Sequence, residues 1–247
     1  MSDEPSRREP GLPTIDVHEY GGKREGVRQA MNRRLYMQLL VFEVAGQAEL
    51  EAEALASRLR GGRVASVVYA DTQDPGSLGV LTWSEDPSHF VRNVRPHLQH
   101  AVLRPRRDFA MLGRTYATGH EPDLEHALLR RAIENVNDDR WPWHVWYPLR
   151  RTGEFAKLDP HEQGSILREH AQIGMAYGAQ ELAHDVRLAC HGLDAGDNEF
   201  VIGLVGPELH PLSHLVQAMR KTRQTSEFIA KMGPFFVGYA LHRTAGA

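Results

Sequence analysis

The sequence is poor in cysteine, and this scarcity excludes several kinds of site. Cys190 is the only cysteine among 247 residues, so neither an intramolecular disulfide nor a cysteine-based zinc or iron–sulfur site can form. Disulfides accumulate in oxidising compartments. We therefore expect a cytoplasmic protein.

Long apolar runs and a strong charge of either sign are also absent. No run approaches the about 18 residues of a membrane-spanning helix, so we predict no membrane span. Lysine and arginine total 29 and aspartate and glutamate total 32, a formal net charge of −3, which argues against a nucleic-acid partner. The sequence has no glycine-rich phosphate loop and no Gly-x-Ser-x-Gly motif, so nucleotide chemistry and serine hydrolysis have no support.

What remains is an ordinary globular composition with a polar beginning. Hydrophobic residues make up 41% and charged residues 25% of the chain, as in typical soluble proteins. Residues 1–25 are rich in proline, glycine and charge and lack the apolar core of a signal peptide. We predict that they form a flexible arm.

The rest of the chain shows one order of elements twice. In the first half, apolar alternation predicts strands, and Ala/Glu/Leu-rich stretches predict helices; the order is strand 36–44, helix 47–60, strands 64–69 and 78–83, helix 87–98 and strand 109–116. A helical connector, 121–135, and a short linker follow. The second half reads strand 144–149, helix 160–177, strands 186–191 and 199–205, helix 211–221 and strand 235–241. We predict an α+β fold of two tandem ferredoxin-like βαββαβ units, with domains at 26–138 and 139–247.

One histidine and one tyrosine of the second half have the clearest chemical potential. His170 recurs with Ile166, Ile173 and Tyr177 at helical spacing, so it lies on the apolar stripe of its helix. It is either a buried histidine bonded to a carbonyl or an axial ligand of iron. Tyr147 shares its strand face with Val145 and Leu149. It is either a core tyrosine or an oxidisable phenol beside a cofactor.

Three arginines could hold an acidic ligand. Arg150 and Arg151 end the strand of Tyr147 and are either solvated or paired with carboxylates. Arg187 lies on the next strand, opposite in direction to Val186 and Leu188. An arginine between apolar neighbours needs a partner or a cavity.

Two other histidine pairs are weaker candidates. His210 and His214 are four residues apart at a helix start, but no third metal ligand is evident. His120 and His126 do not form a His-Glu-x-x-His zinc motif.

The second half, over residues 140–242, resembles the chlorite dismutase and coproheme decarboxylase family of haem proteins. The matching segments are Tyr147-Pro148-Leu149-x-Arg, Arg168-Glu169-His170-x-x-x-Gly174, Gly192-Leu193-Asp194, Met219-Arg220 and Gly233-Pro-Phe-Phe-Val-Gly238. The first half matches the family only in its order of strands and helices. A dimeric α+β barrel fold and a ring-shaped homo-oligomer, a pentamer, are what the resemblance implies.

The resemblance also implies roles for single residues. His170 falls on the proximal iron ligand, and Gly174 one turn later lets a flat ring approach. Tyr147 falls on the radical-relay tyrosine of the decarboxylases, and Arg150 and Arg151 fall in the segment that binds propionates. Arg187 falls on the distal position, which is arginine in chlorite-decomposing members.

Three features depart from the family pattern. Phe155 stands where tryptophan is usual. The segment before Arg187 is about four residues longer than in typical members, so Asp185 could take the distal position instead. The distal histidine base of some decarboxylases has Arg130 at its position, with His126 one turn earlier.

The resemblance therefore implies a haem-dependent oxidoreductase with haem b or iron coproporphyrin III. The favoured reaction is the peroxide-dependent decarboxylation of coproheme to haem b. One alternative is a chlorite dismutase or peroxidase-like enzyme that holds haem b and uses Arg187 with chlorite or hydrogen peroxide. Another is a non-catalytic haem-binding protein. Glu227 is our candidate for the acceptor that holds the second nitrogen of His170.

Overall fold

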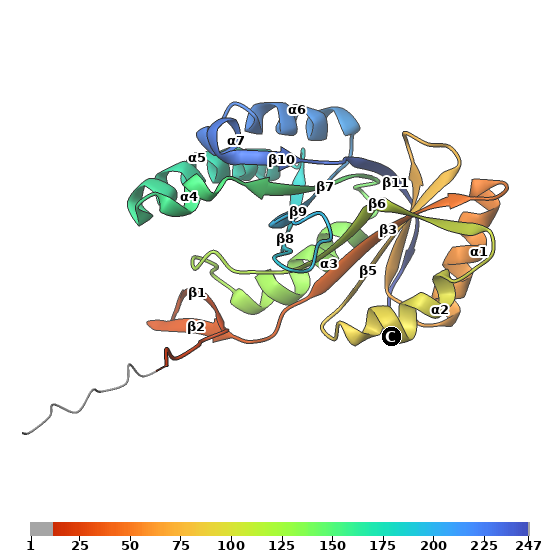
Figure 1. The fold of residues 1–247 in the computed structure, drawn as a ribbon, viewed down its shortest axis with the longest axis horizontal. Coiled ribbons are helices and arrows are strands. Elements are labelled where there is room, and N and C mark those ends of the chain that lie inside the picture. Colours follow the sequence, from red (N-terminus) through yellow and green to blue (C-terminus); the bar gives the residue numbers. More distant parts are fainter. Residues whose placement is uncertain (1–11, 247) are drawn as a thin grey trace, which may run out of the picture.

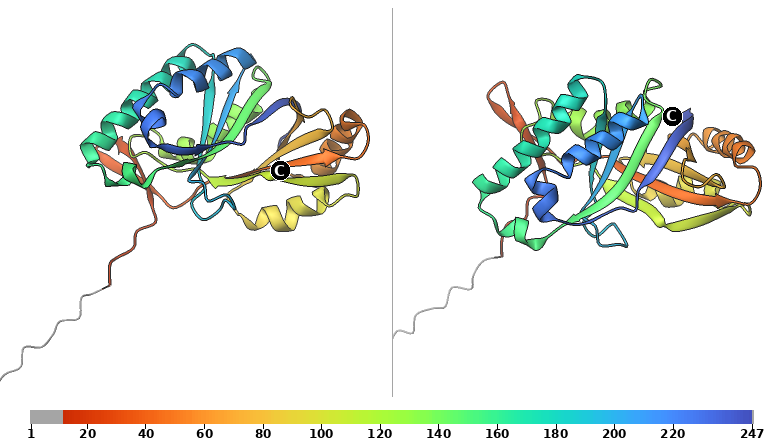
Figure 2. Two further views of the ribbon diagram at one scale, coloured as in Figure 1. Left: turned by 45° about the horizontal axis from the view of Figure 1, so that its top comes forward. Right: turned by 90° about the horizontal axis from the view of Figure 1, so that it is seen from above.

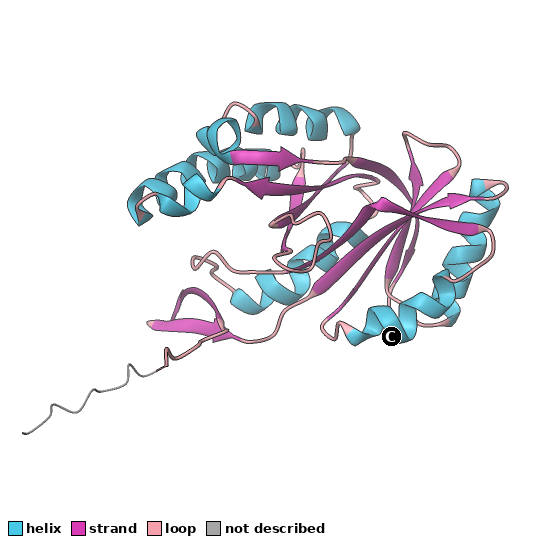
Figure 3. Cartoon of the chain, viewed as in Figure 1, coloured by secondary structure: helices cyan, strands magenta, loops and turns pink. Residues whose placement is uncertain are grey.

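Nine strands pair into one large antiparallel sheet that closes on itself. The computed structural model, which describes residues 12–246, contains two ferredoxin-like units with the strand orders β4-β5-β3-β6 and β8-β9-β7-β11. Strand β11 pairs with β4, and β6 meets β8 through the single pair Arg114↔Ala189. These contacts join the units into a ring of eight strands, so the predicted tandem α+β fold is confirmed (Figures 1 and 3).

The elements include all the predicted ones in the predicted order, and the second half has two short helices and one short strand more, which were not predicted. The first half comprises β1 (Glu19–Arg24), β2 (Val27–Met31), β3 (Tyr36–Val44), α1 (Ala48–Gly61), β4 (Ser66–Asp71), β5 (Ser77–Ser84), η1 (Phe90–Val94), α2 (Arg95–Leu98), β6 (Leu103–Arg114), η2 (His126–Arg130) and α3 (Arg131–Asn137). The second half comprises β7 (Trp143–Arg151), α4 (Gly153–Lys157), α5 (Pro160–Ala179), β8 (His184–Ala189), β9 (Phe200–Gly206), α6 (Leu209–Met219), α7 (Arg223–Phe228), β10 (Ile229–Met232) and β11 (Phe236–Thr244). The segments η1 and η2 are single wide π-helical turns that lead into α2 and α3.

The beginning of the chain is more ordered than predicted. Residues 1–11 of the predicted flexible arm lie outside the described residues. Glu19–Arg24, which we had assigned to that arm, forms β1 and pairs with β2 in a hairpin. The turn is made by Glu25 and Gly26, both with positive φ. A short polar hairpin gives little apolar signal, which is why alternation did not reveal it.

Both halves contribute to the inside of the barrel. One buried cluster joins Met37, Leu39 and Tyr69 of the first half to Trp146 and Phe236 of the second. The large rings fit because glycines face them. A Cβ on Gly79 would lie 2.4 Å from Cζ of Phe236, and one on Gly203 would lie 2.6 Å from Cζ3 of Trp146.

A buried polar pair also crosses the two halves. The Tyr69 hydroxyl lies 2.9 Å from Nδ1 of His144, and Nε2 of His144 lies 3.1 Å from the Trp141 carbonyl oxygen. The carbonyl can only accept, so Nε2 carries the proton and Nδ1 accepts from the tyrosine. Burial lowers the pKa of His144 to about 3, which keeps this ring neutral.

The helices cover the outside of the sheet in two separate layers. Helices α1 and α2 pack on the first unit, and α5 and α6 pack on the second (Figure 2). The two views of Figure 2 show α5 and α6 side by side, and they are in contact. In residues 12–246 no helix combines the length and the apolar character needed to cross a lipid bilayer.

Candidate functional site

The outer face of the second sheet brings two of the predicted residues into one row. Tyr147 of β7 and Arg187 of β8 both pair with Ile202 of the intervening strand β9. Neighbouring strands lie about 4.8 Å apart, so the two side chains rise from backbone positions about 10 Å apart. Tyr147 belongs to the outer cluster with Val145 and Leu149, as predicted.

Tyr147 is deeply buried on this face. It is 6% exposed, and its ring stacks on Phe235 with 4.6 Å between centroids. Burial raises the pKa of Tyr147. Within residues 12–246 its hydroxyl has no hydrogen-bond partner. This phenol therefore stays protonated and has no base beside it.

Helix α5 turns a face toward the sheet without closing fully over it. Asp159 caps the helix, because its carboxylate accepts from the backbone N–H groups of His161 and Glu162. Ile166 is the only fully buried residue of the 20 in α5. The inward residues of its second half remain half-buried; they are His170, Ile173, Gly174 and Tyr177.

His170 is held by a hydroxyl group. Its Nδ1 lies 3.4 Å from Oγ1 of Thr222, and that hydroxyl donates to the Met219 carbonyl oxygen at 2.7 Å. Because the hydroxyl proton is already engaged, Oγ1 faces His170 as an acceptor and Nδ1 carries the proton. Nε2 has no partner among residues 12–246, so its lone pair is free.

Our prediction that Glu227 accepts a hydrogen bond from His170 is wrong. Glu227 instead accepts from Nε of Arg223 at 2.9 Å, one helical turn earlier on α7. Thr222 precedes α7 as its N-cap residue and accepts from the backbone N–H of Thr225. The sequence signal for Thr222 was this capping position, and its contact with α5 depends on tertiary packing.

Arg187 is fixed by a carboxylate shared between the two halves. Its Nε lies 2.9 Å from Oδ2 of Asp185, and NH1 of Arg131 on α3 lies 3.4 Å from Oδ1 of the same residue. Asp185 raises the pKa of Arg187. Burial, and then the charge of Arg187, lower the pKa of His170. Asp185 and Arg187 thus lie on one face of β8 as an ion pair.

The side chains of Arg150 and Arg151 cannot both contact a ligand on the outer face of the sheet. Strand alternation sends them to opposite faces of β7. Arg150 pairs with Asp197 at 2.7 Å. Arg151 lies over the rings of Phe155 and Phe200, with its guanidinium carbon 4.6 and 4.7 Å from their centroids. Only Arg151 is on the face of Tyr147.

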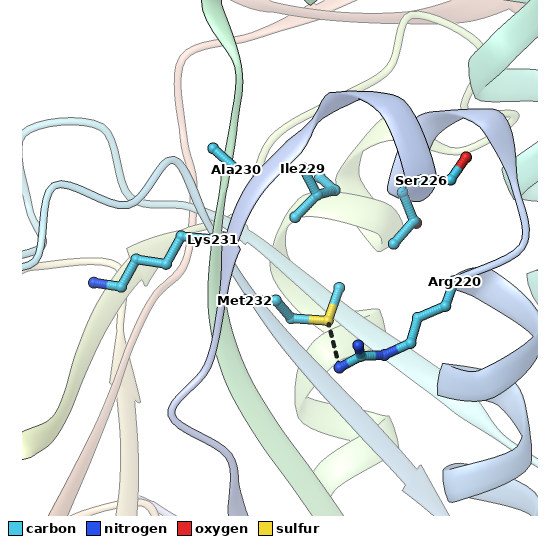
Figure 4. Close-up of a pocket in the computed structure, with 7 residues that line it drawn as sticks. Arg220, Ser226, Ile229, Ala230, Lys231 and Met232 are labelled. Carbon is cyan, nitrogen blue, oxygen red and sulfur yellow. Dashed lines mark hydrogen bonds between the residues drawn. The ribbon is translucent and has the colours of Figure 1, made fainter.

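A cavity next to this face contains cationic and hydroxyl groups that we did not assign. It has a volume of about 260 Å³ and is lined by Arg220, Thr225, Ser226, Ile229, Ala230, Lys231 and Met232. Figure 4 shows Arg220 directed at Met232, whose sulfur lies 3.9 Å from NH2. Ile229 and Met232 pack on the cluster that contains Tyr147. The Met219-Arg220 motif was the available sequence signal for this cavity.

The remaining histidine candidates lie elsewhere. Nε2 of His126 pairs with Glu134 at 2.7 Å on the surface. The Tyr177 hydroxyl bonds to Nδ1 of His214, beside His210. No group of three or more His, Cys, Asp or Glu side chains in the described part of the chain could hold a metal ion.

The chlorite dismutase family model matches residues 53–241 of this chain. The chain belongs to the chlorite dismutase family. No curated protein matches it. The family assignment agrees with the barrel, since both ferredoxin-like units fall largely within the matched range.

Solved structures share the fold at low sequence identity. A novel heme-binding protein from Thermus thermophilus is 17% identical and has a TM-score of 0.66; the match covers 86% of this chain and 93% of that one. Chlorite dismutase from Candidatus Nitrospira defluvii in complex with imidazole is 14% identical, with a TM-score of 0.63 and coverage of 86% and 93%. At these identities the likeness concerns the fold alone.

The residues present in this family member fit an iron porphyrin. Among residues 12–246, Nε2 of His170 is unpaired on a helix face that is only half-buried, and the next inward residues of that helix, Ile173 and Tyr177, pack on the apolar cluster of the sheet. The guanidinium groups of Arg151 and Arg220 lie around that sheet face. At Gly174 a Cβ would meet only Met219 Cε at 3.6 Å, so protein packing does not require glycine there. The cavity at Arg220 is smaller than the roughly 300–1,000 Å³ of most ligand pockets, and its lining residues do not include His170 or Tyr147.

Proposed function

We propose that this protein is a haem-binding oxidoreductase whose substrate is iron coproporphyrin III and whose product is haem b. The observation that carries the proposal is the state of His170. Thr222 fixes the proton on Nδ1, and Nε2 has no partner among residues 12–246, so its lone pair is available. A neutral imidazole held in one orientation is what axial ligation of iron requires.

Under this proposal each residue has a defined task. His170 holds the iron, and Arg151 and Arg220 neutralise carboxylates at the ligand edge. The bound iron porphyrin supplies the oxidising chemistry once hydrogen peroxide is present. Tyr147 would be the oxidisable phenol, on the same sheet face as Arg151.

A second candidate is supported by Arg187. Asp185 lies 2.9 Å from Nε as an ion-pair partner, and the two terminal nitrogens of the guanidinium have no hydrogen-bond partner among residues 12–246. A fixed guanidinium stabilises an anionic oxygen leaving group, as the cleavage of chlorite needs. Haem b would then be a resident cofactor. The third possibility is a haem-binding protein without catalysis.

One experiment separates these candidates. Ferric coproporphyrin III or haem b is added to the apoprotein, the visible spectrum is recorded, and hydrogen peroxide or chlorite is titrated while products are followed by mass. We expect loss of two carboxyl groups from coproporphyrin with peroxide. Uptake of porphyrin without any product would leave only the non-catalytic function.

Two variants assign the reaction to its residues. Tyr147→Phe should retain porphyrin binding and abolish decarboxylation, and an equal yield of haem b from both proteins would refute the role of Tyr147. Arg187→Ala should leave decarboxylation nearly intact and eliminate any chlorite turnover.

The proposal also covers the cellular compartment and the oligomeric state of the protein. We infer a cytoplasmic homo-oligomer, because Cys190 is buried as a thiol and barrels with exposed apolar side chains tend to associate. Leu50, Tyr239 and Leu241 are exposed large apolar residues. Light scattering of the purified chain would give the subunit number, and a monomer at all concentrations would contradict the inference.

A further inference from the structure

A tyrosine and a histidine meet between α5 and α6, outside the machinery described above. The hydroxyl of Tyr177 bonds to Nδ1 of His214, and the two ring centroids are 6.0 Å apart. The hydrogen bond lies at the surface. Nε2 of His214 has no partner among residues 12–246 and can carry the proton of the neutral ring. Nδ1 is then the acceptor and the phenol is the donor.

This pair differs from Tyr147 in what can happen to the phenolic proton. A phenol becomes strongly acidic once it loses an electron, so oxidation is easier when a base already accepts its hydrogen bond. Tyr147 is buried, and no base lies at its hydroxyl within the described residues. Tyr177 has His214 in place. Of the two phenols, Tyr177 is therefore the better equipped to lose an electron and a proton together.

The position of Tyr177 connects it to the proposed porphyrin site. It lies seven residues after His170 on the same inward face of α5, which corresponds to about 10 Å along the helix axis. Tyr177 also packs against the apolar cluster that contains Tyr147. Its hydroxyl end reaches the surface through His214. The pair thus links the interior of the site to solvent.

We propose that Tyr177 and His214 form an oxidisable pair that carries oxidising equivalents from the site to the protein surface. One electron passes from Tyr177 to an acceptor oxidised by peroxide, and the phenolic proton passes to Nδ1 of His214. The products are a neutral tyrosyl radical, an imidazolium and the acceptor reduced by one electron. The link to the porphyrin rests on the proposed function, whereas the redox property of the pair does not.

The pair can be tested without porphyrin. The full-length apoprotein is oxidised with photogenerated tris(bipyridine)ruthenium(III), and the radicals are trapped by rapid freezing for electron paramagnetic resonance. We expect a tyrosyl signal that is lost in Tyr177→Phe. The matched control is Tyr239→Phe, because Tyr239 is also exposed, at 40%, and should retain the signal. A full signal in Tyr177→Phe would overturn the assignment.

The role of the base is tested separately. His214→Asn keeps a polar side chain at the position of Nδ1 but cannot take up a proton at neutral pH. We expect loss of most of the Tyr177 radical in this variant, with the fold unchanged by circular dichroism. An undiminished signal would show that His214 is not the proton acceptor.

The link between Tyr177 and the porphyrin site is tested by adding haem b and then hydrogen peroxide to the protein. A tyrosyl signal that requires Tyr177 and persists in Tyr147→Phe supports the link to the site. A porphyrin-loaded protein that gives no Tyr177 signal overturns the link. A chain that takes up no porphyrin refutes the proposed function, while the ruthenium experiment still decides the redox property of the pair.

Discussion

At the scale of single residues, the proposed chemistry depends on how His170 is oriented. A hydroxyl oxygen, rather than a carboxylate, faces its Nδ1. Thr222 is 1% exposed and is anchored by its own bond to Met219. A ring held by such an acceptor has one tautomer and one orientation, and this preorganises Nε2 for a ligand.

Replacing Thr222 with valine tests this orientation. Valine keeps the shape and removes the acceptor, so we expect haem b affinity to fall by about 10–100-fold, the usual effect of losing the group behind a metal ligand. The iron–histidine vibration of the ferrous protein should also shift. Thr222→Ser should restore both properties. An unchanged affinity and vibration in Thr222→Val would remove Thr222 from the site.

The buried His144 gives a prediction about pH. The unfolded chain binds a proton at the ordinary histidine pKa of 6.5, whereas burial holds the folded-state pKa near 3. Lowering the pH through 6.5 therefore stabilises the unfolded state, and between pH 7 and 5 this group should lower the free energy of unfolding by about 2 kcal/mol.

Denaturant titrations at the two pH values check this contribution. His144→Gln keeps one donor and one acceptor but does not titrate. Between pH 7 and 5 the free energy of unfolding of this variant should therefore fall by about 2 kcal/mol less than that of the wild type. Equal pH dependence in both proteins would show that His144 is protonated in the folded state.

At the scale of elements, the sequence predicted which side chains share a face better than where elements begin. Alternation correctly placed Tyr147 with Val145 and Leu149, and helical spacing correctly turned His170 inward. The register that sets Tyr147 and Arg187 on either side of Ile202 was not predictable, because it depends on which strands pair. The contact of Thr222 with His170 depends on the path between α6 and α7.

Helix α5 is the element whose stability should respond to a ligand. Its inward face is half-buried, so local opening exposes little apolar surface and costs little free energy. Haem b at 100 times its dissociation constant should slow amide exchange in α5 by about 100-fold, equivalent to about 2.7 kcal/mol. Hydrogen exchange with mass spectrometry measures this, with α1 as the internal reference. Equal slowing of amide exchange in α5 and α1 would indicate that haem b stabilises the whole protein and not α5 in particular.

At the scale of the whole molecule, the two units share one interior. Repetition of the strand order predicted two ferredoxin-like units, but closure into a ring came from pairings between β11 and β4 and between β6 and β8. Neither pairing has a sequence signature, because both join segments far apart in the chain. The ion pairs of Asp185 with Arg131 and Arg187 connect the shared barrel to the candidate site.

Because the two units share one interior, a larger side chain there should lower the free energy of unfolding. Gly203→Ala would place a methyl group against the ring of Trp146, and we expect a loss of about 1–3 kcal/mol in the free energy of unfolding. Gly61→Ala in α1 is the control, because no atom other than those of the adjoining residues and the helix's own backbone lies within 4 Å of its Cβ position. Urea denaturation compares the two, and a stable Gly203→Ala protein would show that the barrel interior is loosely packed.

The proposed function requires iron to be held by Nε2 of His170, and a porphyrin titration of His170→Ala examines this directly. Wild-type protein should bind ferric haem b with the visible spectrum and ferrous iron–nitrogen vibration of a histidine ligand. The variant should lose that vibration and regain it when free imidazole is added. The same vibration in His170→Ala without imidazole would contradict the assignment of the ligand.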